Sequence, residues 1–136
     1  MGKIIFKNSE HLKFYEKFLQ KCRSRDVCHK ALVYCLGIDE DTRNHIYTIY
    51  DFKGGFVRPE CLSKGWITSG NGKIIRMAFN LYFDGVPGIY NDELEDQLNE
   101  CINYTVNELF CCEYAKYFWE AIKIRYPEYC CNKMED

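Results

Sequence analysis

Residues 66–82 read Trp66-Ile67-Thr68-Ser69-Gly70-Asn71-Gly72-Lys73-Ile74-Ile75-Arg76-Met77-Ala78-Phe79-Asn80-Leu81-Tyr82. This run begins with residues that cap helices and continues with residues that are nearly all apolar. At about 100° per residue, a helix at about 71–83 gathers its polar side chains in one stripe roughly 80° wide. The members of this polar stripe are Lys73, Arg76, Asn80 and Asp84. Because the rest of its surface is apolar, we expect this helix at the centre of an all-α fold.

The composition of the chain is that of a compact globular domain. It has 136 residues, of which 47% are hydrophobic and 16% aromatic, enough for one core. The net charge of −2 is unevenly distributed, because residues 1–76 hold 14 Lys+Arg against 8 Asp+Glu and residues 77–136 hold 4 against 12. Such asymmetry suits a nucleic-acid-binding face or an acidic tail. We favour the simpler interpretation that the two halves fold against each other and neutralise one another.

Cysteine content and hydropathy indicate a cellular compartment. The nine cysteines follow an N-terminus with no apolar run long enough for export, so we expect reduced thiols and a cytoplasmic protein. No run of about 18 apolar residues predicts a membrane span.

Cap residues and apolar spacing indicate further helices on both sides of the central one. Asn8 or Ser9 starts the first helix, and Asp26 starts a second that Gly37 ends. The pattern continues with a helix from Asp39–Asp41, a break at Gly54-Gly55, a turn at 59–62, a short helix around Leu94 and Leu98, a helix from the capping box Thr105–Glu108, and a last helix from Ala115 to Tyr126. The sequence therefore predicts a single domain over residues 1–136 with about five to seven helices.

Several segments together resemble an uncharacterised family of small proteins. They are Cys28–Gly37, Asp41–His45, Trp66–Tyr82, Tyr104–Cys112 and Arg125–Cys130. The family is a "domain of unknown function" group from low-GC Gram-positive bacteria and their mobile elements. The resemblance spans nearly the whole chain and implies one domain. It carries no known activity, so it implies no catalytic residue.

The turn before the central helix is a candidate anion or partner site. Free backbone amides, the positive end of the helix dipole and two cations meet there, an arrangement that binds phosphate or carboxylate. The order of a Walker A loop is missing. We favour the alternative that the turn only caps the helix and that Arg76 pairs with Asp39, Asp41 or Asp51. The candidate residues are Thr68, Ser69, Lys73, Arg76 and Asn80.

A secondary polar cluster consists of Arg43, Asn44 and His45 near the start of the third predicted helix. His45 has the chemistry of a base or a metal ligand. Only Asp41 stands at ligand spacing from it, however, and one such pair cannot hold zinc. We therefore interpret His45 as a structural histidine.

The cysteine pairs and other reactive residues predict neither a metal nor a cofactor. Cys111-Cys112 and Cys130-Cys131 lack the Cys-x-x-Cys spacing of zinc sites, and we interpret these cysteines as small hydrophobic residues. Cys28-His29 are adjacent on a helix and point about 100° apart, so they form no catalytic pair. We find no nucleophile with a neighbouring base, and the sequence favours a protein that is not an enzyme.

The leading functional hypothesis is an interaction or regulatory module that binds another macromolecule, most simply a protein, as an accessory factor of a mobile element. Its high aromatic content suits binding anchors. The first alternative is nucleic-acid binding, which the pI of about 5.9 disfavours. The second is a small-anion site at the start of the central helix. The cations expected to contact nucleic acid are Lys13, Lys17, Arg43, Arg58, Lys73 and Arg76.

Overall fold

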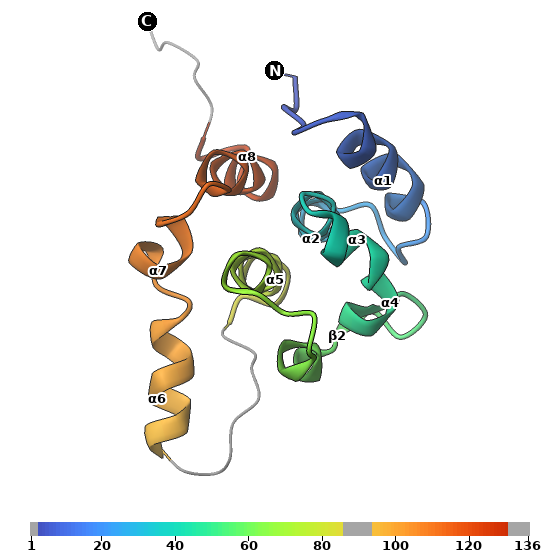
Figure 1. The fold of residues 1–136 in the computed structure, drawn as a ribbon. Helices are drawn as coiled ribbons and strands as arrows, with labels where there is room; N and C mark the ends of the chain where they lie inside the picture. The colour runs from blue at the N-terminus through green and yellow to red at the C-terminus, as the bar shows by residue number, and fades with distance from the viewer. Residues whose placement is uncertain (1–2, 86–93, 131–136) are drawn as a thin grey trace, which may run out of the picture.

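The computed structural model describes residues 3–85 and 94–130, which form a mostly helical fold (Figure 1). The all-α prediction is confirmed. Five helices of nine or more residues are joined by shorter ones and by one small hairpin. In chain order the elements are α1 (Ser9–Leu19), α2 (Val27–Leu36), α3 (Glu40–Asn44), α4 (Ile46–Ile49), β1 (Tyr50–Asp51), β2 (Phe56–Val57), the 3₁₀ helix η1 (Pro59–Ser63), α5 (Ser69–Phe83), α6 (Leu94–Ile102), α7 (Val106–Phe110) and α8 (Ala115–Arg125).

Two helices, α2 and α5, form the centre of the fold. They pack on each other, and α2 also contacts α1 on one side and α8 on the other. In α5, Ile74, Ile75, Ala78 and Phe79 are completely buried, as the apolar pattern predicted. The run from Ala31 to Leu36 in α2 is completely buried as well. A helical segment that is buried on all sides has no exposed polar side. The core therefore depends on α2 as much as on α5, the helix that the sequence placed at its centre.

Side-chain caps at predicted positions begin five of the described helices, among them α3, where Asp39 accepts from the Asp41 amide at 3.0 Å. The carboxamide of Asn8 accepts from the His11 amide at 2.9 Å, and Asp26 accepts from the His29 amide at 3.0 Å. Thr105 caps α7. Thr68 and its partner three residues later form a full capping box at α5, so this helix starts at Ser69, two residues before the predicted start.

A hairpin of two-residue strands interrupts the helices. Tyr50 pairs with Val57 and Asp51 pairs with Phe56 in antiparallel register. Gly55 has a φ of +77°, which only glycine adopts without strain. The sequence predicted only a break at Gly54-Gly55, because strands this short carry no alternating pattern.

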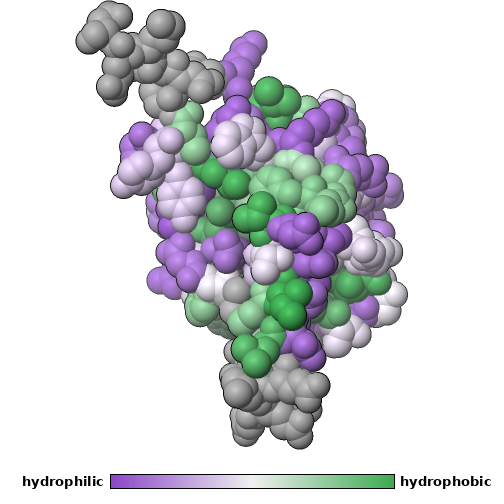
Figure 2. All heavy atoms as spheres, turned by 90° about the vertical axis from the view of Figure 1, so that its left-hand side faces the viewer, coloured by the Kyte–Doolittle hydropathy of each residue, from purple (hydrophilic) through white to green (hydrophobic). Residues whose placement is uncertain are grey.

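The face formed by α6, α7 and α8 exposes apolar side chains (Figure 2). Leu98 and Ile102 lie one turn apart on α6, and both are more than half exposed, as is Val106 at the start of α7. Glu100 lies on the opposite side of α6 and is mostly buried. The predicted helix around Leu98 is therefore present, but its apolar side faces outward. Within residues 3–85 and 94–130, no helix is long and apolar enough to cross a membrane.

Candidate functional site

The polar groups of the turn before α5 bind to one another. Asn71 donates its backbone N–H to the Thr68 hydroxyl at 3.1 Å, and the Thr68 N–H donates to the Asn71 carboxamide oxygen at 2.7 Å. The Asn71 amide group also donates to the Trp66 carbonyl at 3.1 Å. Ser69 is exposed in the first turn of α5. The turn thus performs the capping role that the sequence favoured.

The two cations of the polar stripe are paired with acidic residues from the second half of the chain. Lys73 donates to the carbonyl of Glu108, and its Nζ lies 3.8 Å from the Glu108 carboxylate. Arg76 donates through Nε to Glu100 at 2.8 Å. The partner of Arg76 is therefore Glu100 of α6 and not one of the three aspartates expected from the sequence. A small hollow of about 250 Å³ lies beside this ion pair, next to η1.

Asn80 and Asp84, the remaining members of the polar stripe, contact Gly85 just after α5 and Arg125 of α8, respectively. Asn80 donates to the Gly85 carbonyl at 2.8 Å. Asp84, in left-handed conformation with φ 58°, lies 3.1 Å from the Arg125 guanidinium. Arg125 also donates to the Leu81 carbonyl at 2.8 Å. All four stripe residues thus contact protein groups, and the stripe fastens α6, α7 and α8 to α5.

The secondary polar cluster of Arg43, Asn44 and His45 does not form one site in the structure. The imidazole of His45 stacks on Trp66, with ring centroids 4.1 Å apart and planes at 8°, and its Nδ1 is 2.8 Å from the Asp41 carbonyl. Arg43 donates to the Gly37 carbonyl at 2.9 Å. Arg43 and Asn44 line a groove, and His45 is not among its lining residues.

This groove, here called the basic groove, runs between α1 and α3–α4 and has a volume of about 410 Å³. Lys13 and Lys17 enter it from α1, and Arg43 enters it from α3. These cations belong to two helices that are far apart in the sequence, so the sequence could not predict that they meet. The residues lining the basic groove are Glu10, Lys13, Phe14, Lys17, Phe18, Arg43, Asn44, Ile46 and Tyr47.

Tyr47 is an exposed aromatic side chain at the edge of the basic groove. Its side chain is 61% exposed. Phe18 and Phe52 contact its ring edge-on, with centroids at 6.0 and 5.8 Å. These contacts hold the ring in position while most of it faces solvent.

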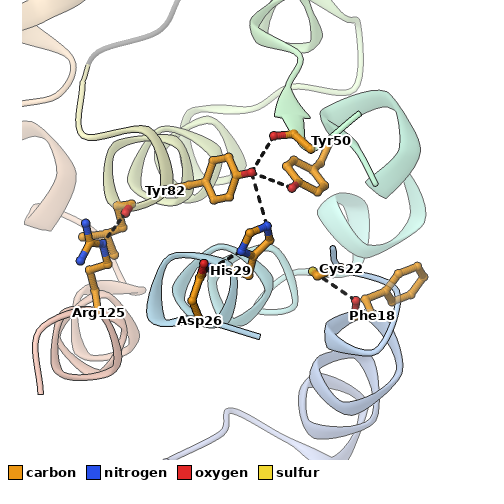
Figure 3. Close-up of polar contacts among 9 residues, drawn as sticks. Phe18, Cys22, Asp26, His29, Tyr50, Tyr82 and Arg125 are labelled. Carbon is orange, nitrogen blue, oxygen red and sulfur yellow. Dashed lines mark hydrogen bonds and ion pairs between the residues drawn. The ribbon is translucent and has the colours of Figure 1, made fainter. Parts of the chain in front are cut away.

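A chain of polar groups that the sequence did not reveal joins α2, α5 and the hairpin (Figure 3). His29 Nδ1 donates to Asp26 at 2.8 Å, and His29 Nε2 lies 3.5 Å from the Tyr82 hydroxyl. That hydroxyl donates to the Gly55 carbonyl at 2.6 Å and lies 2.8 Å from the Tyr50 hydroxyl. The spacing of Asp26 and His29 on one helical turn is visible in the sequence. Tyr50 and Tyr82 are too distant along the chain to be recognised as partners.

The electrostatics of this chain favour a structural role. Burial raises the pKa of the Tyr82 hydroxyl and that of Tyr50, so both stay protonated. Burial also acts to raise the pKa of Asp26, but its hydrogen bonds with His29 outweigh this effect and lower that pKa. A carboxylate, an imidazole and a hydroxyl in this order can activate a nucleophile. Here the hydroxyl is bound to Gly55 and has a raised pKa, the opposite of activation.

A second histidine that the sequence did not single out is completely buried. His11 donates through Nε2 to the Tyr34 carbonyl at 2.7 Å and accepts the Lys7 N–H through Nδ1 at 3.1 Å. Burial lowers the pKa of His11 to about 4. The imidazole is therefore neutral, and both ring nitrogens are satisfied.

Comparison with known proteins identifies a family. The model described as "Family of unknown function (DUF6075)" matches residues 1–136. The chain belongs to the DUF6075 family. No curated protein and no solved structure matches it.

In this DUF6075 member, the cysteines do not converge on a metal site within the described part of the chain, where no group of three His, Cys, Asp or Glu residues could hold a metal ion. Cys111 and Cys112 bond to different acceptors, the Asn107 side chain and the Leu109 carbonyl. Burial raises the pKa of Cys22 to about 11 and that of Cys61 to about 12. Cys131, of the predicted pair Cys130-Cys131, lies outside the described residues.

Proposed function

We propose that this DUF6075 protein is a non-enzymatic cytoplasmic module that binds an anionic region of another macromolecule in the basic groove. The observation that carries the proposal is the convergence of Lys13, Lys17 and Arg43 from two elements beside the exposed ring of Tyr47. The family resemblance suggests an accessory or regulatory factor of a mobile element as the setting. Free cysteines in the described residues are consistent with a reducing compartment.

The basic groove suits the binding of an anion better than the polar stripe does, because its cations are more exposed and less engaged by carboxylates. Lys73 and Arg76 are mostly buried and face carboxylates. In the groove, by contrast, Lys13 is 4.0 Å from Glu10, and both side chains are well exposed, a contact worth little in water. Arg43 uses one guanidinium nitrogen on the Gly37 carbonyl, and a guanidinium has five N–H donors. The groove cations therefore retain capacity for an external anion.

Heparin chromatography of matched charge variants tests this proposal. The double variant Lys13→Gln/Lys17→Gln removes two charges from the groove, and Lys3→Gln/Lys116→Gln removes two exposed charges outside its lining. We expect the groove variant to elute at clearly lower salt than both the control variant and the unchanged protein. Equal elution of the two variants, or no retention of the unchanged protein, would contradict the proposal.

A further inference from the structure

We infer that the occupant of the basic groove is a single-stranded nucleic acid, with one unpaired base stacked on Tyr47 and phosphates along α1. The inference rests on the proposed function, because it names the partner class for the same groove. It combines two features that proteins use for single strands, a row of cations and an exposed aromatic ring.

The cations lie in a row that suits a repeating anion. Lys13 and Lys17 are one helical turn apart on α1, which places their Cβ atoms about 6 Å from each other. Lys21 continues the row just after the helix, and Lys17 and Lys21 place their ammonium groups 5.2 and 5.8 Å from the Phe18 ring centroid. Phe18 is the side chain that braces Tyr47. The row of charge therefore passes beside the aromatic ring.

The interior of the groove favours a nucleic acid over an acidic peptide. Peptides and proteins gain most of their affinity from apolar anchors that enter well-packed pockets. The apolar side chains lining the groove, Phe14, Phe18 and Ile46, are each more than nine-tenths buried and already packed in the core. A polyanion needs no such pocket, because neutralising its phosphates releases counterions and supplies the affinity.

Tyr47 favours a single strand over a duplex. A paired base is already stacked on both faces within a double helix, whereas an unpaired base is free to stack on an aromatic side chain. The Tyr47 ring is fixed by Phe18 and Phe52 and is mostly exposed. Glu10 is the only carboxylate among the described residues that line the groove, so repulsion of a phosphate backbone is limited.

Fluorescence anisotropy tests the inference with four labelled probes: oligothymidylate and oligouridylate of about 12 nucleotides, a DNA duplex of the same length, and a poly-glutamate peptide of similar length. We expect both oligonucleotides to bind more tightly than the peptide and than a duplex of the same length. Their affinity should fall steeply with salt, and Lys13→Gln/Lys17→Gln should reduce the salt slope by about 1.4. The control Lys3→Gln/Lys116→Gln should keep the slope.

Two substitutions at Tyr47 separate stacking from charge. Tyr47→Phe keeps the ring and should keep the affinity, whereas Tyr47→Leu keeps only apolar contact with Phe18 and Phe52 and should weaken binding about tenfold. Circular dichroism would establish that each variant is folded. Binding that is unchanged in Tyr47→Leu, or equal for single strands and duplex, would overturn the inference.

The failure of this inference is distinguishable from failure of the proposed function. If the poly-glutamate peptide binds and the oligonucleotides do not, and Lys13→Gln/Lys17→Gln weakens that peptide, the partner is an acidic protein segment. The inference would then be wrong and the proposed function would stand. If none of the probes binds, or if the groove variant binds as well as the control, both are overturned.

Discussion

Arg76 and Glu100 join the oppositely charged halves of the chain through a hydrogen-bonded ion pair of 2.8 Å. Their side chains are only 21% and 12% exposed. Lys73 and Glu108 link the same halves a short distance away. The excess of basic residues before position 77 and of acidic residues after it is therefore partly neutralised inside the fold. The stripe that first suggested an anion site holds the second half of the chain on α5.

A double-mutant cycle should detect coupling between Arg76 and Glu100. Arg76→Met leaves the mostly buried Glu100 carboxylate without its partner, and Glu100→Gln leaves the Arg76 guanidinium without its counter-charge, so each should lower the free energy of unfolding by about 2–4 kcal/mol. The double variant should lose less than the sum, with a coupling of about 1–3 kcal/mol. Urea unfolding measures these values. The exposed pair Lys13 and Glu10 is the control, with expected coupling below about 0.5 kcal/mol.

The local features of this fold follow from short-range sequence signals, and its site does not. Thr68 and Asp26 are recognisable as caps because each side-chain oxygen accepts a hydrogen bond from the backbone N–H three residues later. Arg76 and Glu100 are 24 residues apart, and nothing along the chain selects that glutamate over Asp39 or its neighbours. Which residues pair across such distances depends on how the helices pack. For the same reason, the sequence did not reveal that cations from α1 and α3 meet in the basic groove.

The orientation of α6 could not be predicted from its sequence pattern either. A sequence pattern identifies which residues share a side of a helix, but not which side faces the core. Leu98 and Ile102 share the apolar side of α6, and this side faces solvent in the structure. The ion pair of Glu100 explains the orientation, because a carboxylate paired with a mostly buried arginine must face inward.

Tyr82→Phe should destabilise the protein by removing the centre of the polar chain. The Tyr82 hydroxyl contacts Gly55, Tyr50 and His29, so its loss removes a hydrogen-bond partner from the partly buried Gly55 carbonyl and from the hydroxyl of the buried Tyr50. We expect a loss of about 1–3 kcal/mol in the free energy of unfolding, measured by thermal or urea unfolding. Tyr47→Phe removes an exposed hydroxyl and should change stability by less than about 0.5 kcal/mol. Equal effects of the two variants would refute the role of the polar chain.

Gly55→Ala should be costly, whereas Gly65→Ala should not. Gly55 has a φ of +77°, and an added Cβ would lie 3.1 Å from the Arg23 side chain. An L-residue in this conformation costs about 1–2 kcal/mol. At Gly65 an added Cβ meets nothing within 4 Å, and alanine there should be neutral or slightly stabilising. Comparing the two melting temperatures checks the prediction, and a similar fall in both would contradict it.

Cysteine alkylation should divide the thiols by burial. Cys101 and Cys111 are exposed, whereas Cys22 and Cys61 are buried and have raised pKa values. Only a thiolate reacts quickly with iodoacetamide, so the folded protein at about pH 8 should be modified first at the exposed positions. Peptide mass spectrometry over time measures the order. Urea should make all sites react at similar rates, and early modification of Cys61 without urea would contradict the structure.

His11 should make stability fall when the protein is acidified. Its pKa is about 4 in the folded protein, whereas an unfolded histidine has a pKa of 6.5. Between these values the unfolded chain binds a proton that the folded protein excludes. Stability from this group is therefore complete above pH 6.5 and is lost as the pH falls toward 4. The total is up to about 3 kcal/mol.

His11→Gln isolates this contribution from the carboxylates that also titrate in acid. Glutamine can still donate to the Tyr34 carbonyl, which His11 contacts at 2.7 Å, but it does not titrate. Urea unfolding at several pH values should show a steeper loss of stability in the unchanged protein than in the variant between about pH 6.5 and 4. The two curves should run parallel above this range. Parallel curves throughout would mean that His11 becomes protonated without unfolding the protein, and that its burial does not exclude the charged form.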